Sequence, residues 1–144
     1  MNALQIGIMI FTILEIGNVC ILYFMPETTM ANGIGVFNAW EKSKGDPQVH
    51  SLMKYLVNWV AGAKLIFVLM GIVVIIFGNE LTQIFTVVAL IISILSFYYR
   101  LFPSIKKMDS LGEITPKGYS KTLNFMIASF IIGFIAVLVI YLLT

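Results

Sequence analysis

The sequence predicts an all-α, polytopic integral membrane protein built as a four-transmembrane-helix bundle, and three observations lead to this prediction. Of the 144 residues, 60% are hydrophobic and only 11% are charged, whereas soluble domains carry about 25% charged residues. Four apolar stretches of about 20 residues are each long enough to cross a bilayer as a helix. The basic residues gather in the segments on one side of these stretches, as the loops of membrane proteins do.

The predicted spans form one domain, residues 1–144, and are separated by residues that end helices. They cover about residues 4–25, 55–77, 81–102 and 123–143. Pro26 is expected to end the first span and Pro103 the third, because proline interrupts the hydrogen bonds of a helix. The second helix is expected to begin before its span, with Asp46 as N-cap and Pro47 as the first helical residue, so that its first turns stand in the membrane interface.

Orientation follows from the basic residues. Residues 26–54 and 103–122 are the predicted cytoplasmic loops. Eight of the nine basic residues lie in or beside them: Lys42, Lys44, Lys54, Arg100, Lys106, Lys107, Lys117 and Lys121. The positive-inside rule therefore places both termini on the non-cytoplasmic side of a plasma or inner membrane. The N-terminal segment lacks the basic region and the cleavage site of a signal peptide, so we expect its apolar run to persist as a span.

The first loop contains a weak helical pattern. In "NGIGVFNAWEKSK", Gly33, Val36, Phe37 and Trp40 recur at helical spacing. This spacing predicts a short amphipathic interfacial helix on the cytoplasmic membrane face. The alternative is an ordinary loop with two exposed aromatic residues. The 103–122 segment, with mixed charges, glycines and prolines, is expected to be a solvated connector.

Small and polar residues form a stripe along each predicted span. The first three stripes contain Ile8, Thr12, Glu15 and Asn18; Ala61, Lys64, Val68, Gly71, Ile75 and Gly78; and Thr82, Thr86, Ala89, Ser93, Ser96 and Arg100. Residues at these spacings share one helix face. Small residues allow helices to approach closely in lipid, which is sufficient reason for most of each stripe. It does not account for Glu15 and Lys64.

Two ionisable residues inside predicted spans need a reason, because each costs about 2.5–3.5 kcal/mol near a helix centre on insertion scales. At about 1.5 Å per residue, Glu15 lies roughly 15 Å from the cytoplasmic boundary and Lys64 roughly 8–9 Å from it. The two side chains can therefore meet, with Asn18 at an intermediate depth. One interpretation is a structural ion pair that fixes helix register. Another has Lys64 extended to the interface and Glu15 protonated against Asn18.

The functional interpretation is a polar pocket that opens to the cytoplasm. Polar side chains gather in the cytoplasmic half of the predicted bundle, whereas the opposite half is almost entirely aliphatic, which disfavours a static pore. Intramembrane carboxylates commonly mark proton relays and substrate pathways. The candidate binding residues are Glu15, Asn18, Lys64, Asn58, Ser93, Ser96, Tyr98, Arg100 and Asn124.

Three functional classes remain open at this stage. The favoured one is binding or proton-linked movement of a small cationic or amphipathic molecule, by a homo-oligomer and preferably a dimer, because the short chain has no internal repeat. The length, the four spans and the single glutamate of the first span resemble the arrangement of small multidrug-resistance transporters, whereas Lys64 and the long first loop depart from it. The alternatives are a non-catalytic scaffold or accessory subunit and, less favoured, a small lipid-modifying enzyme with His50 or Glu15 as base.

Several kinds of site and partner are not expected. Cys20 is the single cysteine, so the chain cannot form an intrachain disulfide or a cysteine-based metal site. A lone histidine, His50, does not make a zinc site, and we expect neither metal nor cofactor. No basic patch with interleaved aromatics stands clear of the spans, so nucleic acid is not an expected partner. The expected partners are the lipid bilayer, anionic lipid near Arg100, Lys106 and Lys107, and a small-molecule ligand.

Overall fold

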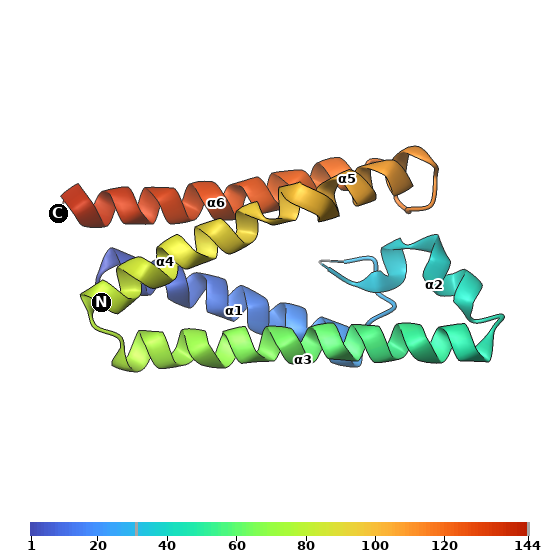
Figure 1. The fold of residues 1–144 in the computed structure, drawn as a ribbon, viewed down its shortest axis with the longest axis horizontal. Helices are drawn as coiled ribbons and strands as arrows, with labels where there is room; N and C mark the ends of the chain where they lie inside the picture. The colour runs from blue at the N-terminus through green and yellow to red at the C-terminus, as the bar shows by residue number, and fades with distance from the viewer. Residues whose placement is uncertain (31, 144) are drawn as a thin grey trace.

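The computed structural model describes residues 1–30 and 32–143, which form helices joined by short connections (Figure 1). In order, the elements are α1 (Ala3–Phe24), the 3-10 turn η1 (Ile34–Val36), α2 (Asn38–Ser43), α3 (Pro47–Phe77), α4 (Glu80–Leu95), α5 (Phe97–Ser110) and α6 (Tyr119–Leu143). Four helical stretches, α1, α3, α4 with α5, and α6, are long and apolar enough to cross a membrane. The predicted all-α class and four-helix bundle are confirmed.

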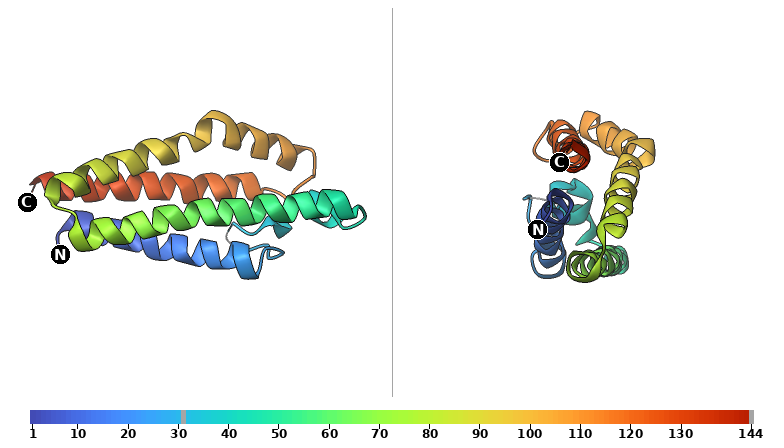
Figure 2. Two further views of the ribbon diagram at one scale, coloured as in Figure 1. Left: turned by 60° about the horizontal axis from the view of Figure 1, so that its bottom comes forward. Right: turned by 90° about the vertical axis from the view of Figure 1, so that its left-hand side faces the viewer.

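The helices run along one long axis. In Figure 1, α3 and α6 follow the two edges of the molecule, with α1 and α4 between them. Both chain termini lie at one end, together with the turn between α3 and α4. We call this the termini end, and we call the opposite end, which holds α2 and residues 111–118, the loop end. The end-on view in Figure 2 shows the long helices arranged around a common axis.

Side-chain caps set the helix starts. The Asp46 carboxylate accepts hydrogen bonds from the backbone N–H groups of Gln48 and Val49, and Pro47 opens α3, as predicted. Asn2 caps α1 in a reciprocal capping box with Gln5. Such caps satisfy N–H groups that have no partner inside the helix. The start of each of these helices is therefore encoded locally.

The helix that contains the third predicted span does not end at Pro103, so the expectation that this proline ends the helix was wrong. The helix breaks instead at Ser96 and resumes as α5, which continues through Pro103 to Ser110. A proline inside a helix removes one backbone hydrogen bond, and neighbouring turns can retain the helix around it. The first part of the predicted connector, residues 103–110, is therefore helical. Gly112, with φ of +71°, ends α5 in a Schellman arrangement in which the N–H of Glu113 donates to the carbonyl of Met108.

The first loop folds inward. A short helix, α2, is present, so the alternative of an ordinary loop with exposed aromatics was wrong. Its apolar side does not face the membrane: Trp40 is fully buried against Leu22, Val57 and Ala61. The tightest constraint comes before it, where a Cβ on Gly35 would collide with the backbone carbonyl of Glu27. Glycine there allows two backbone segments to touch.

Three hydrophobic clusters of described residues hold the bundle together, one at the termini end and two at the loop end. At the termini end, one cluster joins α1, α4 and α6: Leu4, Ile8, Val87 and Phe134. At the loop end there are two. One joins α1, α2 and α3 through Leu22, Trp40, Val57 and Ala61. The other joins α5, α6 and the loops through Val36, Phe97, Ile105, Ile114, Tyr119 and Leu123. The bundle is thus packed as one body at the termini end and as two helix groups at the loop end.

A loop clasp connects the two helix groups. We define it as Val36–Asn38 together with residues 112–115. The N–H of Thr115 donates to the carbonyl of Val36 at 2.8 Å, and the N–H of Asn38 donates to the carbonyl of Glu113 at 3.0 Å. The Asn38 amide also donates to the carbonyl of Gly112 and accepts from the Thr115 hydroxyl. The side chain of Val36 is fully buried in the α5–α6 cluster, so the clasp is anchored by packing as well as by hydrogen bonds.

Gly71→Ala is expected to destabilise the protein by about 1–3 kcal/mol, because its Cβ would meet a stiff neighbour. A Cβ at this position would lie 2.6 Å from Thr12 Oγ1 of α1. The Thr12 hydroxyl donates to the carbonyl of Ile8 at 2.8 Å, and a β-branched side chain has few other rotamers. Thermal unfolding in one mild detergent measures the effect.

Gly133→Ala is the matched control, since a Cβ there would meet nothing within 4 Å. It should be neutral or stabilising by up to about 1 kcal/mol, because alanine favours the helix. Combining Gly71→Ala with Thr12→Ala should restore part of the loss. Equal effects of the two glycine changes would contradict the close approach of α1 and α3.

Candidate functional site

Glu15 and Lys64 form an ion pair between α1 and α3. Lys64 Nζ donates to Glu15 Oε2 at 2.5 Å, and the Asn18 amide donates to Glu15 Oε1 at 3.3 Å. The side chains of Lys64 and Glu15 are 27% and 14% exposed, respectively. Both carboxylate oxygens therefore have a donor, yet the pair is not sealed inside the bundle.

The stripes on α1 and α3 bring these residues together. α1 packs more extensively on α3 than on any other helix. Ile8 and Thr12 of the α1 stripe are buried, as are Ala61 and Val68 of the α3 stripe. Since Glu15 and Lys64 belong to the same two stripes, the contact that buries the small residues also brings the two charges into contact.

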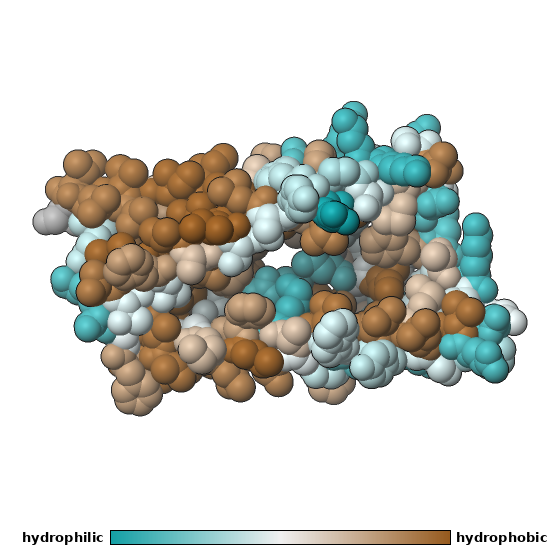
Figure 3. Space-filling model, viewed as in Figure 1, coloured by the Kyte–Doolittle hydropathy of each residue, from teal (hydrophilic) through white to brown (hydrophobic). Residues whose placement is uncertain are grey.

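The stripe on α4 points elsewhere. The buried residues of α4 are Gln83 and Val87, which lie on a different face from the predicted serine stripe. Ser93 and Ser96 are exposed, and the Ser96 hydroxyl donates to the carbonyl of Ser93 rather than to another helix. A weakly polar band follows α4 across the face shown in Figure 3. The most regular stripe in the sequence is thus largely uncovered by the other helices.

The other predicted binding residues form no hydrogen bond or salt bridge with Glu15 or Lys64 among the described residues. The Tyr98 hydroxyl donates to the backbone carbonyl of Asn124 at 3.5 Å, which links α5 to α6. Asn58 is exposed on α3. Arg100 is exposed, with its guanidinium carbon 5.5 Å from the centroid of the Tyr99 ring. The structure therefore assembles Glu15, Asn18 and Lys64 and leaves the remaining six candidates at other places in the bundle.

The molecule is hollowed in its middle. Figure 3 shows an opening between the α4–α5 side and the α3 side, with hydrophilic side chains beside it. Two further cavities lie elsewhere and are mainly apolar. One of about 180 Å³ lies between α1 and α6, beside Gly7, Phe11 and Phe134. The other, of about 250 Å³, lies under the first loop beside Leu22 and Met53. Neither of these two cavities is lined by Glu15 or Lys64.

A polar cluster closes the termini end, and the sequence analysis did not identify it. The Asn2 amide donates to Gln83 Oε1 at 2.8 Å, and the Gln83 amide donates to the carbonyl of Gly78 at 2.8 Å. Gln83 is almost completely buried. The Gln5 amide reaches the carbonyl of Ile75. The spacing of Asn2 and Gln5 is a capping-box pattern that could have indicated the start of α1, but it carries no signal for the contacts with Gln83 and Ile75.

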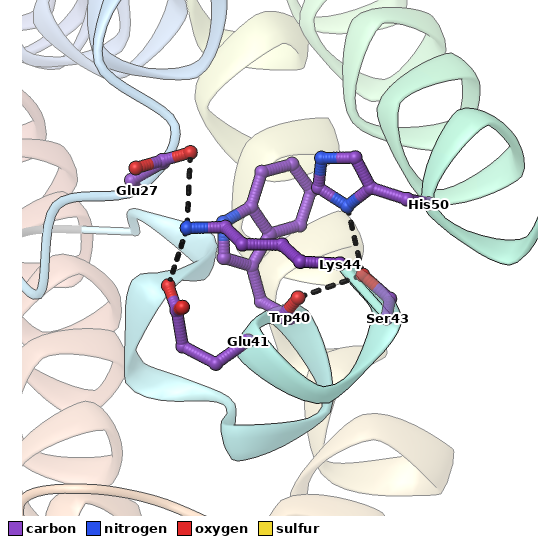
Figure 4. A network of polar contacts seen from close by, with 6 residues as sticks. All are labelled: Glu27, Trp40, Glu41, Ser43, Lys44 and His50. Atoms are coloured by element: carbon purple, nitrogen blue, oxygen red, sulfur yellow. Dashed lines mark hydrogen bonds and ion pairs between the residues drawn. The ribbon is translucent and has the colours of Figure 1, made fainter. Parts of the chain in front are cut away.

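A second polar network lies at the loop end, around α2 (Figure 4). Lys44 pairs with Glu41 at 2.8 Å and with Glu27 at 3.4 Å. The hydrogen bond to Glu41 raises the pKa of Lys44 above its ordinary value of 10.5; burial opposes this and the charge of Glu27 adds to it. These exposed pairs connect α2 to the segment that follows α1.

His50 is part of this network as a packing residue. The Ser43 hydroxyl donates to the carbonyl of Trp40 at 2.7 Å, and His50 Nδ1 lies 2.8 Å from Ser43 Oγ. The Ser43 hydroxyl therefore joins the carbonyl of Trp40 and the His50 ring in one hydrogen-bond network. The His50 ring also contacts the Trp40 ring, with 4.9 Å between centroids.

Neither a metal site among the described residues nor a similarity to known proteins points to a function. Within residues 1–30 and 32–143, no three His, Cys, Asp or Glu side chains gather as a metal site would require. Comparisons with protein-family models, with curated proteins and with solved structures found no match.

Proposed function

We propose that this membrane protein binds a small lipophilic organic cation at Glu15 and exchanges it for a proton. The observation that carries the proposal is the carboxylate of Glu15, held in the middle of α1 and partly exposed beside Lys64. A carboxylate in a low-dielectric site is the natural partner of a cation that has given up its water.

A cationic ligand would take the place of Lys64. Both oxygens of Glu15 already accept hydrogen bonds, from Lys64 and from Asn18. The Lys64 ammonium repels a second cation, so a ligand cation would engage Glu15 most strongly when this ammonium moves aside. The long stem of lysine allows this, since its head can extend toward the loop-end interface while the stem stays among apolar side chains.

The central hollow offers the route. The two helix groups at the loop end are separate clusters joined by the loop clasp, whereas the termini end is packed and closed by Asn2 and Gln83. With the basic loops in the cytoplasm, as the positive-inside rule requires, a ligand would enter from the cytoplasmic side. Movement across the membrane would need an opening at the other end, for which we propose a homodimer, as in larger transporters built from two repeats.

The test uses two lipophilic ions of equal shape and opposite charge, tetraphenylphosphonium and tetraphenylborate. We expect the purified protein to bind the phosphonium ion by isothermal titration calorimetry, with affinity that rises with pH because protonation of Glu15 removes the anion. Binding of the borate ion should be at least about tenfold weaker, which is about 1.4 kcal/mol. Equal binding of both ions, or binding that ignores pH, would reject the proposal.

A second candidate function is a membrane scaffold, and the outward stripe of α4 favours it. Thr82, Ala89 and Ser93 on α4 are exposed on one face, and Ser96, which follows the helix, is exposed as well. Small and hydroxyl residues on a lipid-facing helix allow another helix to approach closely. A scaffold should co-purify with a partner and keep it after Glu15→Gln, whereas the cation-binding protein should lose its ligand.

A further inference from the structure

The outward face of α5 differs from the rest of the bundle surface. α5 is buried through Phe97, Ile105 and Asp109, which pack toward α6 and the loops. The opposite face is exposed and contains Tyr99, Arg100, Pro103, Lys106 and Lys107. At 100° per residue these five positions fall within about one third of the helix circumference. α5 is therefore an amphipathic helix with a basic outer face.

No ion pair within residues 1–30 and 32–143 neutralises the positive charge of this face. Asp109 is the single acidic residue of α5, and it lies on the buried side. Its carboxylate accepts hydrogen bonds from the N–H of Gly118 at 2.8 Å and from the N–H and hydroxyl of Ser120. Among the described residues, the ion pairs involve Lys44 and Lys64 and none of the basic residues of α5. Three cationic side chains thus point outward without an anion.

The position of α5 along the bundle matches the headgroup layer. α4 has 16 residues, which is about 24 Å of helix, and the first turn of α5 brings the length close to the hydrocarbon thickness of about 30 Å. Pro103 has no N–H for the carbonyl of Tyr99, and a carbonyl without a helical partner is costly in hydrocarbon but not among water and headgroups. The guanidinium of Arg100 lies over the Tyr99 ring, as tyrosines and arginines do at membrane interfaces.

We propose that the outer face of α5 is a binding site for the anionic headgroup of a membrane phospholipid. Charge complementarity selects this occupant, since a planar guanidinium and two ammonium groups suit a phosphodiester. The break at Ser96 separates α5 from α4, which sets the basic face along the interface. The acyl chains of the lipid would lie beside α4, where Ile92 and Leu95 are exposed.

The test compares two double variants that remove the same charge. Arg100→Gln with Lys107→Gln changes the α5 face, and Lys117→Gln with Lys121→Gln changes exposed residues outside α5. Native mass spectrometry of protein in detergent with added phosphatidylglycerol or phosphatidylcholine counts retained lipids. We expect the parent to prefer phosphatidylglycerol. The α5 variant should bind it about 10- to 30-fold more weakly, and the control less than about threefold more weakly.

Equal losses in the two variants, or no preference of the parent for phosphatidylglycerol, would overturn the assignment. Should the first α5 variant not fold, Lys106→Gln with Lys107→Gln tests the same face and leaves the Tyr99–Arg100 contact intact.

Discussion

Glu15→Gln and Lys64→Met are expected to change cation affinity in opposite directions. Glu15→Gln removes the negative charge and should weaken tetraphenylphosphonium binding by about 10- to 100-fold, the range of one charge-assisted hydrogen bond. Lys64→Met removes the competing ammonium, which lies 2.5 Å from Glu15 Oε2, and should strengthen binding by about tenfold or more. Calorimetric titration of both variants at two pH values measures the effects.

The same two variants also decide between a site and a structural ion pair. In Glu15→Gln the Asn18 amide can still donate to the side-chain oxygen that remains, and the Lys64 stem can extend to the interface, so each protein should fold. If the pair is only structural, each single change should destabilise the protein by about 2–3 kcal/mol, the double change should recover stability, and neither should alter ligand binding. If cation binding loses its pH dependence in Glu15→Gln but keeps it in Lys64→Met, the pH dependence comes from the Glu15 carboxylate.

Trp40→Ala is expected to be the most destabilising single substitution, by about 3–5 kcal/mol. Trp40 is 0% exposed and packs in the cluster that joins α2 to α1 and α3. Its ring also contacts the His50 ring. Truncation would therefore leave a cavity and remove the packing that supports the Ser43–His50 hydrogen bond. Thermal unfolding followed by circular dichroism measures the loss.

The second tryptophan provides a matched control. Trp59, two residues beyond the buried Val57 on α3, is 65% exposed. Trp59→Ala should cost less than about 1 kcal/mol in detergent, since few protein contacts are lost. Similar losses for both tryptophans would mean that α2 does not pack on the bundle as the structure describes.

Local patterns determined much of the architecture. Apolar stretches of membrane length predicted the four long helices, and Asp46 followed by Pro47 predicted the start of α3. The contact between Glu15 and Lys64 was foreseen because both lie on stripes of small residues, and such stripes pack together in lipid. In each case the pattern lies within a single helical segment.

Long-range packing determined the rest. Helical periodicity shows that Ser93 and Ser96 share a face, but it does not say which face α1 and α6 will cover, and the structure turns that stripe outward. Periodicity also groups Val36 with Trp40. It does not show that the protein interior, rather than the membrane, buries them.

The difference between local and long-range information is clearest for the fold class and for the loop clasp. The sequence by itself determined an all-α membrane bundle with a carboxylate in its first helix, because length, hydropathy and helical period are properties of single segments. The tertiary structure alone decided that the loop clasp joins the two helix groups, because the Val36–Thr115 and Asn38–Glu113 bonds connect segments more than 70 residues apart. Contacts between such distant segments form only where several helices fix both partners in place, and no local pattern encodes that.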